Sequence, residues 1–204
     1  MNKKGIKGFT MIEIIIVVVI IGLVAGIAMF NLINMLPKFR VNNAVRTLAS
    51  NLQWARLKAV SENNNFIVYF YSPDANNIYR YEILDDDDND GTKDPTETLY
   101  DAERYHLPSG IKFGRAKSGV KRTTCGGTID SDGIHFTGDK VTFTPTGRPD
   151  KNGSVYLIPE DDDEDHDQKT IHWRAISVTT NGRIKTWIYD ASVENCSNGQ
   201  GPWK

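Results

Sequence analysis

The chain contains 204 residues, of which 39% are hydrophobic and 25% are charged, and its formal net charge is −2. This composition fits one ordinary globular domain with an additional segment, and it excludes a disordered chain, a fibrous repeat and a disulfide-rich mini-scaffold. Without the three lysines of the first eight residues, 21 basic side chains face 26 acidic ones. The sequence therefore argues against a protein that coats nucleic acid through a generally basic surface.

An apolar segment dominates the N-terminal part of the chain. The 20 residues from Met11 to Phe30 are all apolar or glycine except Glu13, and as a helix they would span about 30 Å, the thickness of the hydrocarbon core of a membrane. The three lysines before it predict a cytoplasmic N-terminus and a C-terminal domain on the far side of the membrane. A secretory signal peptide is disfavoured, because its apolar core would be shorter and would end at a cleavage site between small residues.

Glu13 is the one ionisable residue of this apolar segment. A carboxylate inside a membrane costs roughly 3 kcal/mol and requires a partner, and the segment contains no basic side chain. Cleavage between Gly8 and Phe9 would create a positively charged amine at Phe9, four residues before Glu13. In a bundle of staggered identical helices, Glu13 of one subunit would pair with the amine of its neighbour only at the correct stagger.

Residues 7–13, Lys-Gly-Phe-Thr-Met-Ile-Glu, resemble the prepilin signal of type IV pilins and type II secretion pseudopilins. The resemblance implies that a prepilin peptidase and methyltransferase cuts after Gly8 and methylates Phe9, and that Glu13 acts in assembly. It also implies that the partners are other pilins or pseudopilins and an inner-membrane assembly platform. Many type IV pilins have proline where this chain has Phe30, and the first proline here is Pro37.

The remaining chain is expected to continue as one long helix from about residue 9 to residue 60 and then to form strands. Pro37 is tolerable as a kink between two helical halves. Beyond it, apolar residues recur at a spacing of three or four, which is typical of the packed face of an amphipathic helix; these residues are Val41, Val45, Leu48, Leu52, Ala55 and Ala59.

Eight segments rich in β-branched and aromatic residues predict strands, at residues 66–71, 78–84, 111–113, 134–136, 141–144, 155–158, 170–178 and 183–189. Between the last two, Asn181-Gly182 is typical of a two-residue type I′ hairpin. The expected fold class is α+β, in which the long N-terminal helix, transmembrane in its first half, packs on an antiparallel β-sheet.

Three stretches of the expected globular domain, residues 44–59, 141–148 and 176–184, resemble the GspH/FimT branch of minor pseudopilins and minor pilins. The resemblance implies a type IV pilin-like fold in three parts. These are a cleaved leader (1–8), a transmembrane and filament-core helix (9–36), and a periplasmic globular domain (37–204).

A twelve-residue acidic segment between two expected strands fits the calcium loop of EF-hand proteins. The candidate ligands are the carboxylates of Asp86, Asp88, Asp90, Asp94 and Glu97 and the backbone carbonyl of Thr92. Gly91 occupies the position at which this loop turns sharply. Neighbouring carboxylates repel one another and a cation would neutralise them, so we favour Ca²⁺ over the alternative of a solvated acidic loop.

Cys125 and Cys196 are the two cysteines of the chain. In a domain outside the cytoplasm, two cysteines favour a disulfide over two unpaired thiols. Such a bond would tie the C-terminal tail to the body of the domain.

Two other charged segments are interpreted as solvated loops. Residues 160–167 contain seven acids but lack the glycine and the spacing of a calcium loop, and five bases lie without an acid between Ile111 and Arg122. Some FimT-type minor pilins bind DNA through a basic C-terminal region, but residues 191–204 offer only Lys204. Nucleic acid is therefore not expected as a partner.

The four histidines, His106, His135, His166 and His172, show no spacing typical of a catalytic or metalloprotease motif. We therefore do not expect an enzyme. The leading hypothesis is a single-pass inner-membrane protein that assembles into the periplasmic pseudopilus of a type II secretion system, near its tip. The alternatives are a FimT-like minor pilin of a type IV pilus, in adhesion, motility or DNA uptake, and a calcium-dependent ligand-binding or enzymatic module merely anchored by a helix.

The processing hypothesis predicts the mass of the mature N-terminus. Protein purified from its native host should begin at Phe9, and this residue should carry a methyl group on its amine. Intact and N-terminal peptide mass spectrometry would measure both. A chain that keeps Met1, or that is cut at another position, would contradict the hypothesis.

Overall fold

The computed structural model describes residues 9–100, 105–115, 118–160, 172–190, 192–193, 196 and 201–204, and for residues 30–34 it describes the backbone alone. The expected cleavage residue Gly8, Lys117 of the basic segment, and residues 161–167 of the second acidic segment with His166 lie outside the described residues. The chain divides into two compact units, one that ends at Leu36 and one that begins at Pro37. Each unit is described by itself.

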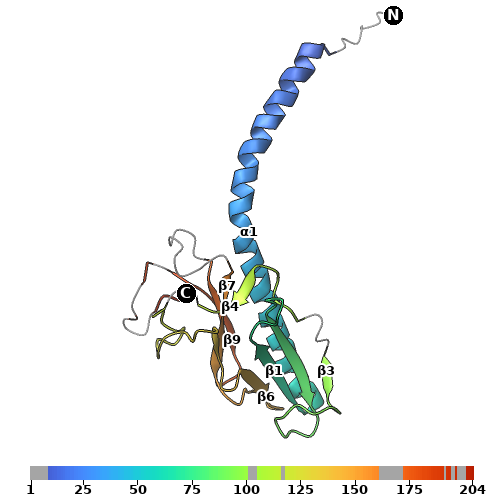
Figure 1. The fold of residues 1–204 in the computed structure, drawn as a ribbon. Helices are drawn as coiled ribbons and strands as arrows, with labels where there is room; N and C mark the ends of the chain where they lie inside the picture. The colour runs from blue at the N-terminus through green and yellow to red at the C-terminus, as the bar shows by residue number, and fades with distance from the viewer. Residues whose placement is uncertain are drawn as a thin grey trace, which may run out of the picture. The chain divides into compact units, whose positions relative to one another are not determined.

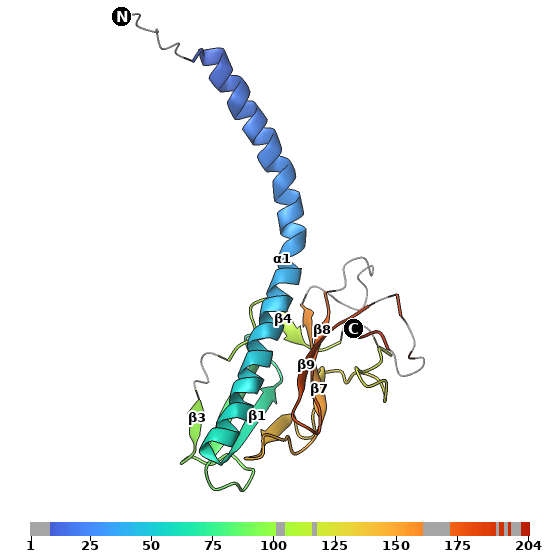
Figure 2. The ribbon, with the colours of Figure 1, turned by 180° about the vertical axis from the view of Figure 1, so that it is seen from behind.

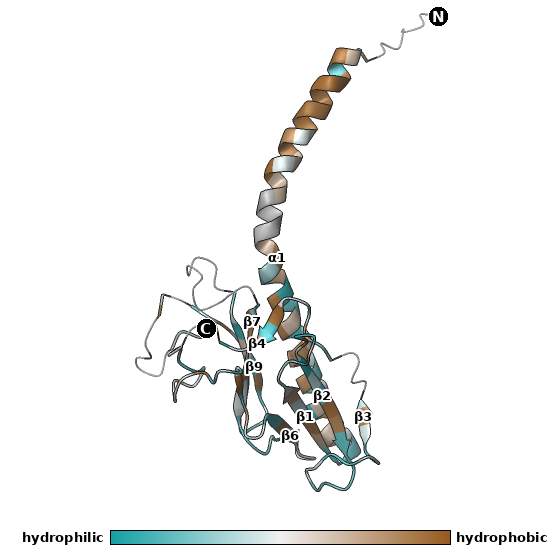
Figure 3. Ribbon diagram, viewed as in Figure 1, coloured by the Kyte–Doolittle hydropathy of each residue, from teal (hydrophilic) through white to brown (hydrophobic). Residues whose placement is uncertain are grey.

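A single helix, α1 (Met11–Glu62), contributes to both units. In the first unit its described side chains are exposed on all sides, and the segment Met11–Met29, with a mean hydropathy of 3.0, is long and apolar enough to cross a membrane (Figure 3). Pro37 lies inside the helix, which tolerates it although proline cannot donate a backbone hydrogen bond. The helix ends before Asn63, whose positive φ of 59° is typical of a C-terminal cap.

In the second unit, α1 buries the apolar face that the sequence predicts. All six residues of the predicted stripe are at most 4% exposed, and they are Val41, Val45, Leu48, Leu52, Ala55 and Ala59. The spacing that predicts this face is that of the α-helix itself, so the face follows from the local pattern.

The described strands form two antiparallel sheets (Figures 1 and 2). The first has the order β3-β2-β1-β6 and consists of β1 (Asn65–Tyr71), β2 (Arg80–Asp86), β3 (Thr98–Tyr100) and β6 (Lys140–Phe143). The second has the order β4-β7-β8-β9 and consists of β4 (Ile111–Phe113), β7 (Gly153–Pro159), β8 (Arg174–Val178) and β9 (Ile184–Ile188), while β5 (Ile134–His135) also pairs with β7. The expected α+β fold is confirmed, with two sheets where the sequence analysis expected one.

The main core lies between the buried face of α1 and both sheets. Alternate residues of β7 explain how the second sheet takes part, because Val155 and Leu157 point into this core while Tyr156 and Ile158 belong to a second cluster. Strands β7 and β8 are therefore buried on both faces, which explains the continuous apolar run of β7.

Strand β2 differs from its expected position by two residues. The sequence analysis ended this strand at Leu84, but it continues through Asp85 and Asp86, which pair with Phe66 and Asn65 of β1. Aspartate is depleted in strands, so its residue type gives no indication of the extension. The ladder to β1 supplies the backbone partners that hold these two residues in the sheet.

The turn between β8 and β9 is not the expected type I′ turn. The backbone N–H of Gly182 donates to the carbonyl of Thr179 at 2.7 Å, and the N–H of Thr179 donates to the carbonyl of Arg183 at 3.0 Å. Gly182 has a φ of 77°, whereas Asn181 is not among the residues of positive φ. The connection is therefore a three-residue loop with a type I turn followed by a glycine in the left-handed region.

The turn after β6 has the same pattern of hydrogen bonds at residues 144–148, and the two turns meet. Gly147 has a φ of 71°, and its carbonyl accepts a hydrogen bond from Nε of Arg56 at 2.7 Å. A Cβ added to Gly182 would lie 2.2 Å from the same carbonyl oxygen. The three stretches that carry the resemblance to the GspH/FimT branch thus converge on one packing point.

This close approach predicts different costs for two glycine substitutions. Gly138→Ala, at a φ of 70° with open space around the position, should cost about 1 kcal/mol of unfolding free energy from backbone strain alone. Gly182→Ala adds a backbone clash and should cost roughly 3 kcal/mol. Urea denaturation of both variants measures the difference, and equal costs would contradict the packing point.

Candidate functional site

The N-terminus of α1 is closed by a reciprocal pair of hydrogen bonds between Thr10 and Glu13. The backbone N–H of Glu13 donates to Oγ1 of Thr10 at 3.3 Å, and the N–H of Thr10 donates to Oε2 of Glu13 at 3.4 Å. This arrangement is a capping box. The sequence analysis missed this role, although Thr-x-x-Glu directly before an apolar run is its known signature.

The capping box leaves Glu13 free to accept a further donor. Both bonds are longer than the usual 2.9–3.0 Å, and a carboxylate can accept about four hydrogen bonds. Glu13 is exposed, as is Phe9, whose side chain is 79% exposed. An interaction between Glu13 and an amine of another subunit is therefore geometrically compatible with the cap.

The acidic segment connects β2 and β3 as a hairpin loop. The ladder between β2 and β3 ends at the pair Asp85 and Thr98, so residues 86–97, the twelve residues of the expected calcium loop, connect this pair, and the first of them, Asp86, still pairs with β1. The structure brings one carboxylate oxygen from each of Asp86, Asp88, Asp90 and Glu97 within 4.8 Å of one another. Asp94 does not join this group, and its backbone N–H donates to Oε2 of Glu97 at 2.7 Å.

Hydrogen bonds within the loop orient the four carboxylates. Oδ2 of Asp86 accepts from the N–H of Gly91 at 3.1 Å, and Oδ1 of Asp88 accepts from the N–H of Asp90 at 3.1 Å. Oδ1 of Asp90 accepts from the N–H of Thr92 at 2.7 Å. Gly91 has a φ of 78°, so the sharp turn requires the conformation that glycine adopts most readily.

Residues from two other strands support the loop from outside, and the sequence analysis did not include them. The side-chain amide of Asn65 donates to Oδ2 of Asp86 at 3.3 Å, and its backbone N–H donates to Oδ1 of Asn89 at 2.8 Å. Nζ of Lys140 donates to the carbonyl of Gly91 at 2.6 Å. Only the register of β1 against β2 and β6 places these residues beside the loop.

The loop concentrates negative charge. Burial raises the pKa of Glu97, and the negative charges of Asp86 and Asp88 raise it further. The hydrogen bonds from Thr92 lower the pKa of Asp90. Among the described residues, no lysine, arginine or histidine forms an ion pair with any of the four converging carboxylates.

The structure joins Cys125 and Cys196 in a disulfide, with a Cα–Cα distance of 5.9 Å. The bond connects the loop before β5 to the C-terminal part of the chain. The same two segments are also joined by Trp203, whose Nε1–H donates to the carbonyl of Lys121 at 2.8 Å. Trp203 is buried in the second cluster against Tyr156, so the linked segments cover the outer face of the second sheet.

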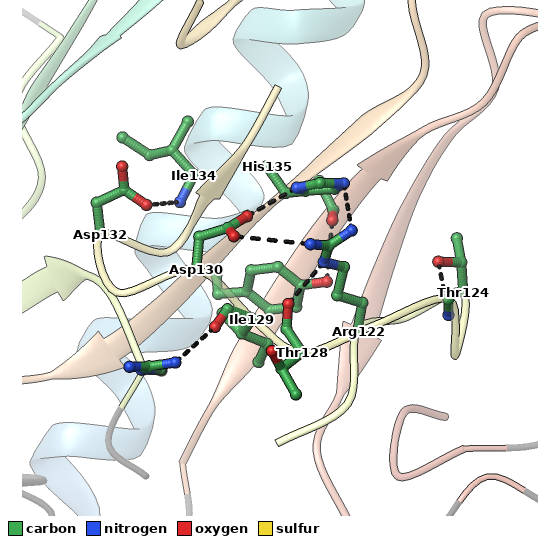
Figure 4. A network of polar contacts seen from close by, with 12 residues as sticks. Arg122, Thr124, Thr128, Ile129, Asp130, Asp132, Ile134 and His135 are labelled. Carbon is green, nitrogen blue, oxygen red and sulfur yellow. Dashed lines mark hydrogen bonds and ion pairs between the residues drawn. The ribbon is translucent and has the colours of Figure 1, made fainter. Parts of the chain in front are cut away.

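The described part of the basic segment is engaged within the domain (Figure 4). Nδ1 of His135 lies 2.7 Å from Oδ2 of Asp130, and its Nε2 lies 2.7 Å from Nη1 of Arg122. Nη1 of Arg115 donates to the carbonyl of Ile129 at 2.9 Å. These contacts hold two of the five bases in place, so this segment offers fewer free cations than its sequence indicates.

Comparisons with known proteins identify two parts of the chain. A family model described as Type II transport protein GspH matches residues 44–182. A model of the prokaryotic N-terminal methylation motif matches residues 3–29. No curated protein resembles the chain closely enough to count as a match.

Two solved structures illustrate the distant structural likeness of the chain. The type IV minor pilin FimU of Pseudomonas aeruginosa is 16% identical, with a TM-score of 0.40, over 74% of this chain and 90% of that one. The minor pseudopilin EpsH from the type II secretion system of Vibrio cholerae is 11% identical, with a TM-score of 0.41, over 73% of this chain and 97% of that one.

Proposed function

Since the chain belongs to the GspH family of type II transport proteins, we propose that it is a minor pseudopilin of a type II secretion system. The observation that carries this proposal is the order of two features in one chain, a methylation motif at residues 3–29 followed by the family domain at residues 44–182. The protein assembles through α1 into the periplasmic pseudopilus, near its tip, and this filament drives the export of folded proteins. Its role is mechanical and not catalytic.

The surface of the first half of α1 supports an anchored and then assembled state. An apolar helix that is exposed on all sides requires either a membrane or the packing of other helices. The segment Met11–Met29 is long enough to span a membrane. Before assembly it spans the inner membrane with the domain in the periplasm, and after cleavage at Gly8 and methylation at Phe9 it packs in the filament core.

Glu13 sets the stagger of the assembled helices in this proposal. Glu13 lies four positions after Phe9, which corresponds to a displacement of about 6 Å along a helix axis. A neighbour shifted by this amount would bring its N-terminal amine beside Glu13. The capping box with Thr10 neutralises no charge, so it cannot replace the amine as a partner in an apolar environment.

Two substitutions separate the cap from the charge. Glu13→Gln keeps a capping box, since glutamine can close it, but removes the charge, and it should lower incorporation into filaments at least about tenfold, as expected for a lost buried ion pair. Thr10→Ala removes the cap, costs about 1 kcal/mol of helix stability and keeps the charge, so it should assemble nearly normally.

Quantitative immunoblotting of sheared filaments measures incorporation, and mass spectrometry confirms that both variants are cleaved after Gly8. If Glu13→Gln assembled as well as the wild type, the role of Glu13 in the stagger would be excluded. If Thr10→Ala failed as severely as Glu13→Gln, the capping box would itself be required for assembly, and the expectation that the charge of Glu13 alone decides incorporation would be wrong.

The choice of secretion system is tested by deletion of the gene in its native host. Loss of the protein should cause folded exoproteins to accumulate in the periplasm, while surface pili and twitching motility remain. Complementation with the wild-type gene should restore export, and complementation with Glu13→Gln should not. Loss of pili, motility or DNA uptake with normal export would instead assign the protein to a type IV pilus.

A further inference from the structure

The loop between β2 and β3 contains a buried carboxylate oxygen without a partner. Asp86 is 0% exposed, and its Oδ2 accepts hydrogen bonds from Gly91 and Asn65, but its Oδ1 has no hydrogen-bond partner in the described structure. Oε1 of Glu97, at the opposite end of the loop, is likewise buried and unpartnered. A buried carboxylate oxygen without a donor is costly, so both atoms indicate a missing positive ligand.

The carboxylates of Asp86, Asp88, Asp90 and Glu97 converge at this position. Oxygens that all lie within 4.8 Å of one another can surround one shared Ca²⁺ ion, because opposite oxygens of a calcium site, each at 2.3–2.6 Å from the ion, lie about 5 Å apart. Mg²⁺ retains several waters and is usually bound by one or two carboxylates, so the convergence of four carboxylates favours Ca²⁺.

We propose that the β2–β3 loop is a calcium site that fastens the edge strand β3 to the rest of the first sheet. Asp86, Asp88, Asp90 and Glu97 supply carboxylate oxygens at loop positions 1, 3, 5 and 12, and the carbonyl of Thr92 supplies position 7. Asp94, at position 9, acts through a bound water. This inference does not depend on which secretion system or pilus the protein serves.

The position of the site in the sheet gives the ion a structural task. Asp86 is the last residue of β2, and Glu97 directly precedes β3. Strand β3 has three residues and lies at the edge of its sheet. An ion bound by both Asp86 and Glu97 would join the two strand ends, and Tyr100 of β3 would be held against Trp54 of α1, whose ring centroid is 5.0 Å away.

The run of aspartates provides a matched control within the same loop. Asp87 lies between two proposed ligands but accepts a hydrogen bond from the side-chain amide of Asn64 at 3.3 Å and is absent from the converging group. Asp87→Asn and Asp88→Asn therefore remove the same charge from adjacent residues. Only the second removes a proposed ligand.

Calcium binding is tested on the full-length mature chain in detergent after treatment with a chelator. Calorimetric titration with CaCl₂ should reveal one ion per chain. At a calcium concentration about a hundred times Kd, the melting temperature should rise by roughly 5–10 °C. Hydrogen exchange of the β3 amides should slow on addition of calcium, while exchange in the second sheet should change little.

Single substitutions test whether calcium binding depends on the proposed ligands. Asp88→Asn and Glu97→Gln should each weaken calcium binding at least about tenfold, because Glu97 is the bidentate position of such a loop, while circular dichroism should show that both remain folded. Asp87→Asn should weaken calcium binding clearly less than Asp88→Asn, since it removes a nearby charge but no ligand. Absence of calcium binding at 10 mM would overturn the proposal. Equal effects of Asp87→Asn and Asp88→Asn would also overturn it, because they would show that the loop binds cations only as a diffuse acidic surface. Equal affinities for Mg²⁺ and Ca²⁺ would lead to the same conclusion.

Discussion

One continuous helix must serve two environments, and the rest of the molecule depends on this constraint. In Met11–Met29 every side chain of α1 is exposed, so this part is stable only in lipid or among other helices. From Val41 to Ala59 the same helix buries one face in the core of the globular domain. Since no described residue breaks the helix between these parts, the element that is long and apolar enough to cross a membrane also supplies the packed face of the globular domain.

The second sheet has two strands whose apolar side chains must be covered on both faces. Strands β7 and β8 are buried on both faces, but α1 and the first sheet can cover only one of them. The loop before β5 and the described C-terminal residues cover the other face, and isolated β-bridges, Lys121 with Thr128 and Tyr189 with Trp203, pair residues within them. The disulfide between Cys125 and Cys196 and the indole of Trp203 join these segments directly. This cross-link lowers the conformational entropy that the two segments would gain if they detached from the sheet or unfolded.

Two acidic features, one in each compact unit, carry negative charge that no described residue neutralises by an ion pair. Glu13 is exposed in the isolated chain and its local hydrogen bonds with Thr10 leave its charge unbalanced, so its proposed partner belongs to another subunit. Asp86 and Glu97 each present an unpartnered oxygen within one loop, so their proposed partner is a small cation. In both cases the missing positive charge indicates the proposed partner, which is an amine of another subunit for Glu13 and a small cation for Asp86 and Glu97.

The sequence by itself determined the features that depend on local spacing. The prepilin-like signal, the buried face of α1 from Val41 to Ala59, and the twelve-residue acidic loop are contiguous patterns, and the structure places each of the last two at the expected residues. The tertiary structure alone decided the division into two sheets, the extension of β2 through Asp86, the support of the loop by Asn65 and Lys140, and the meeting of Gly147, Gly182 and Arg56. These features depend on strand register and on contacts between residues far apart in the chain, and the local propensity of a residue predicts neither of them.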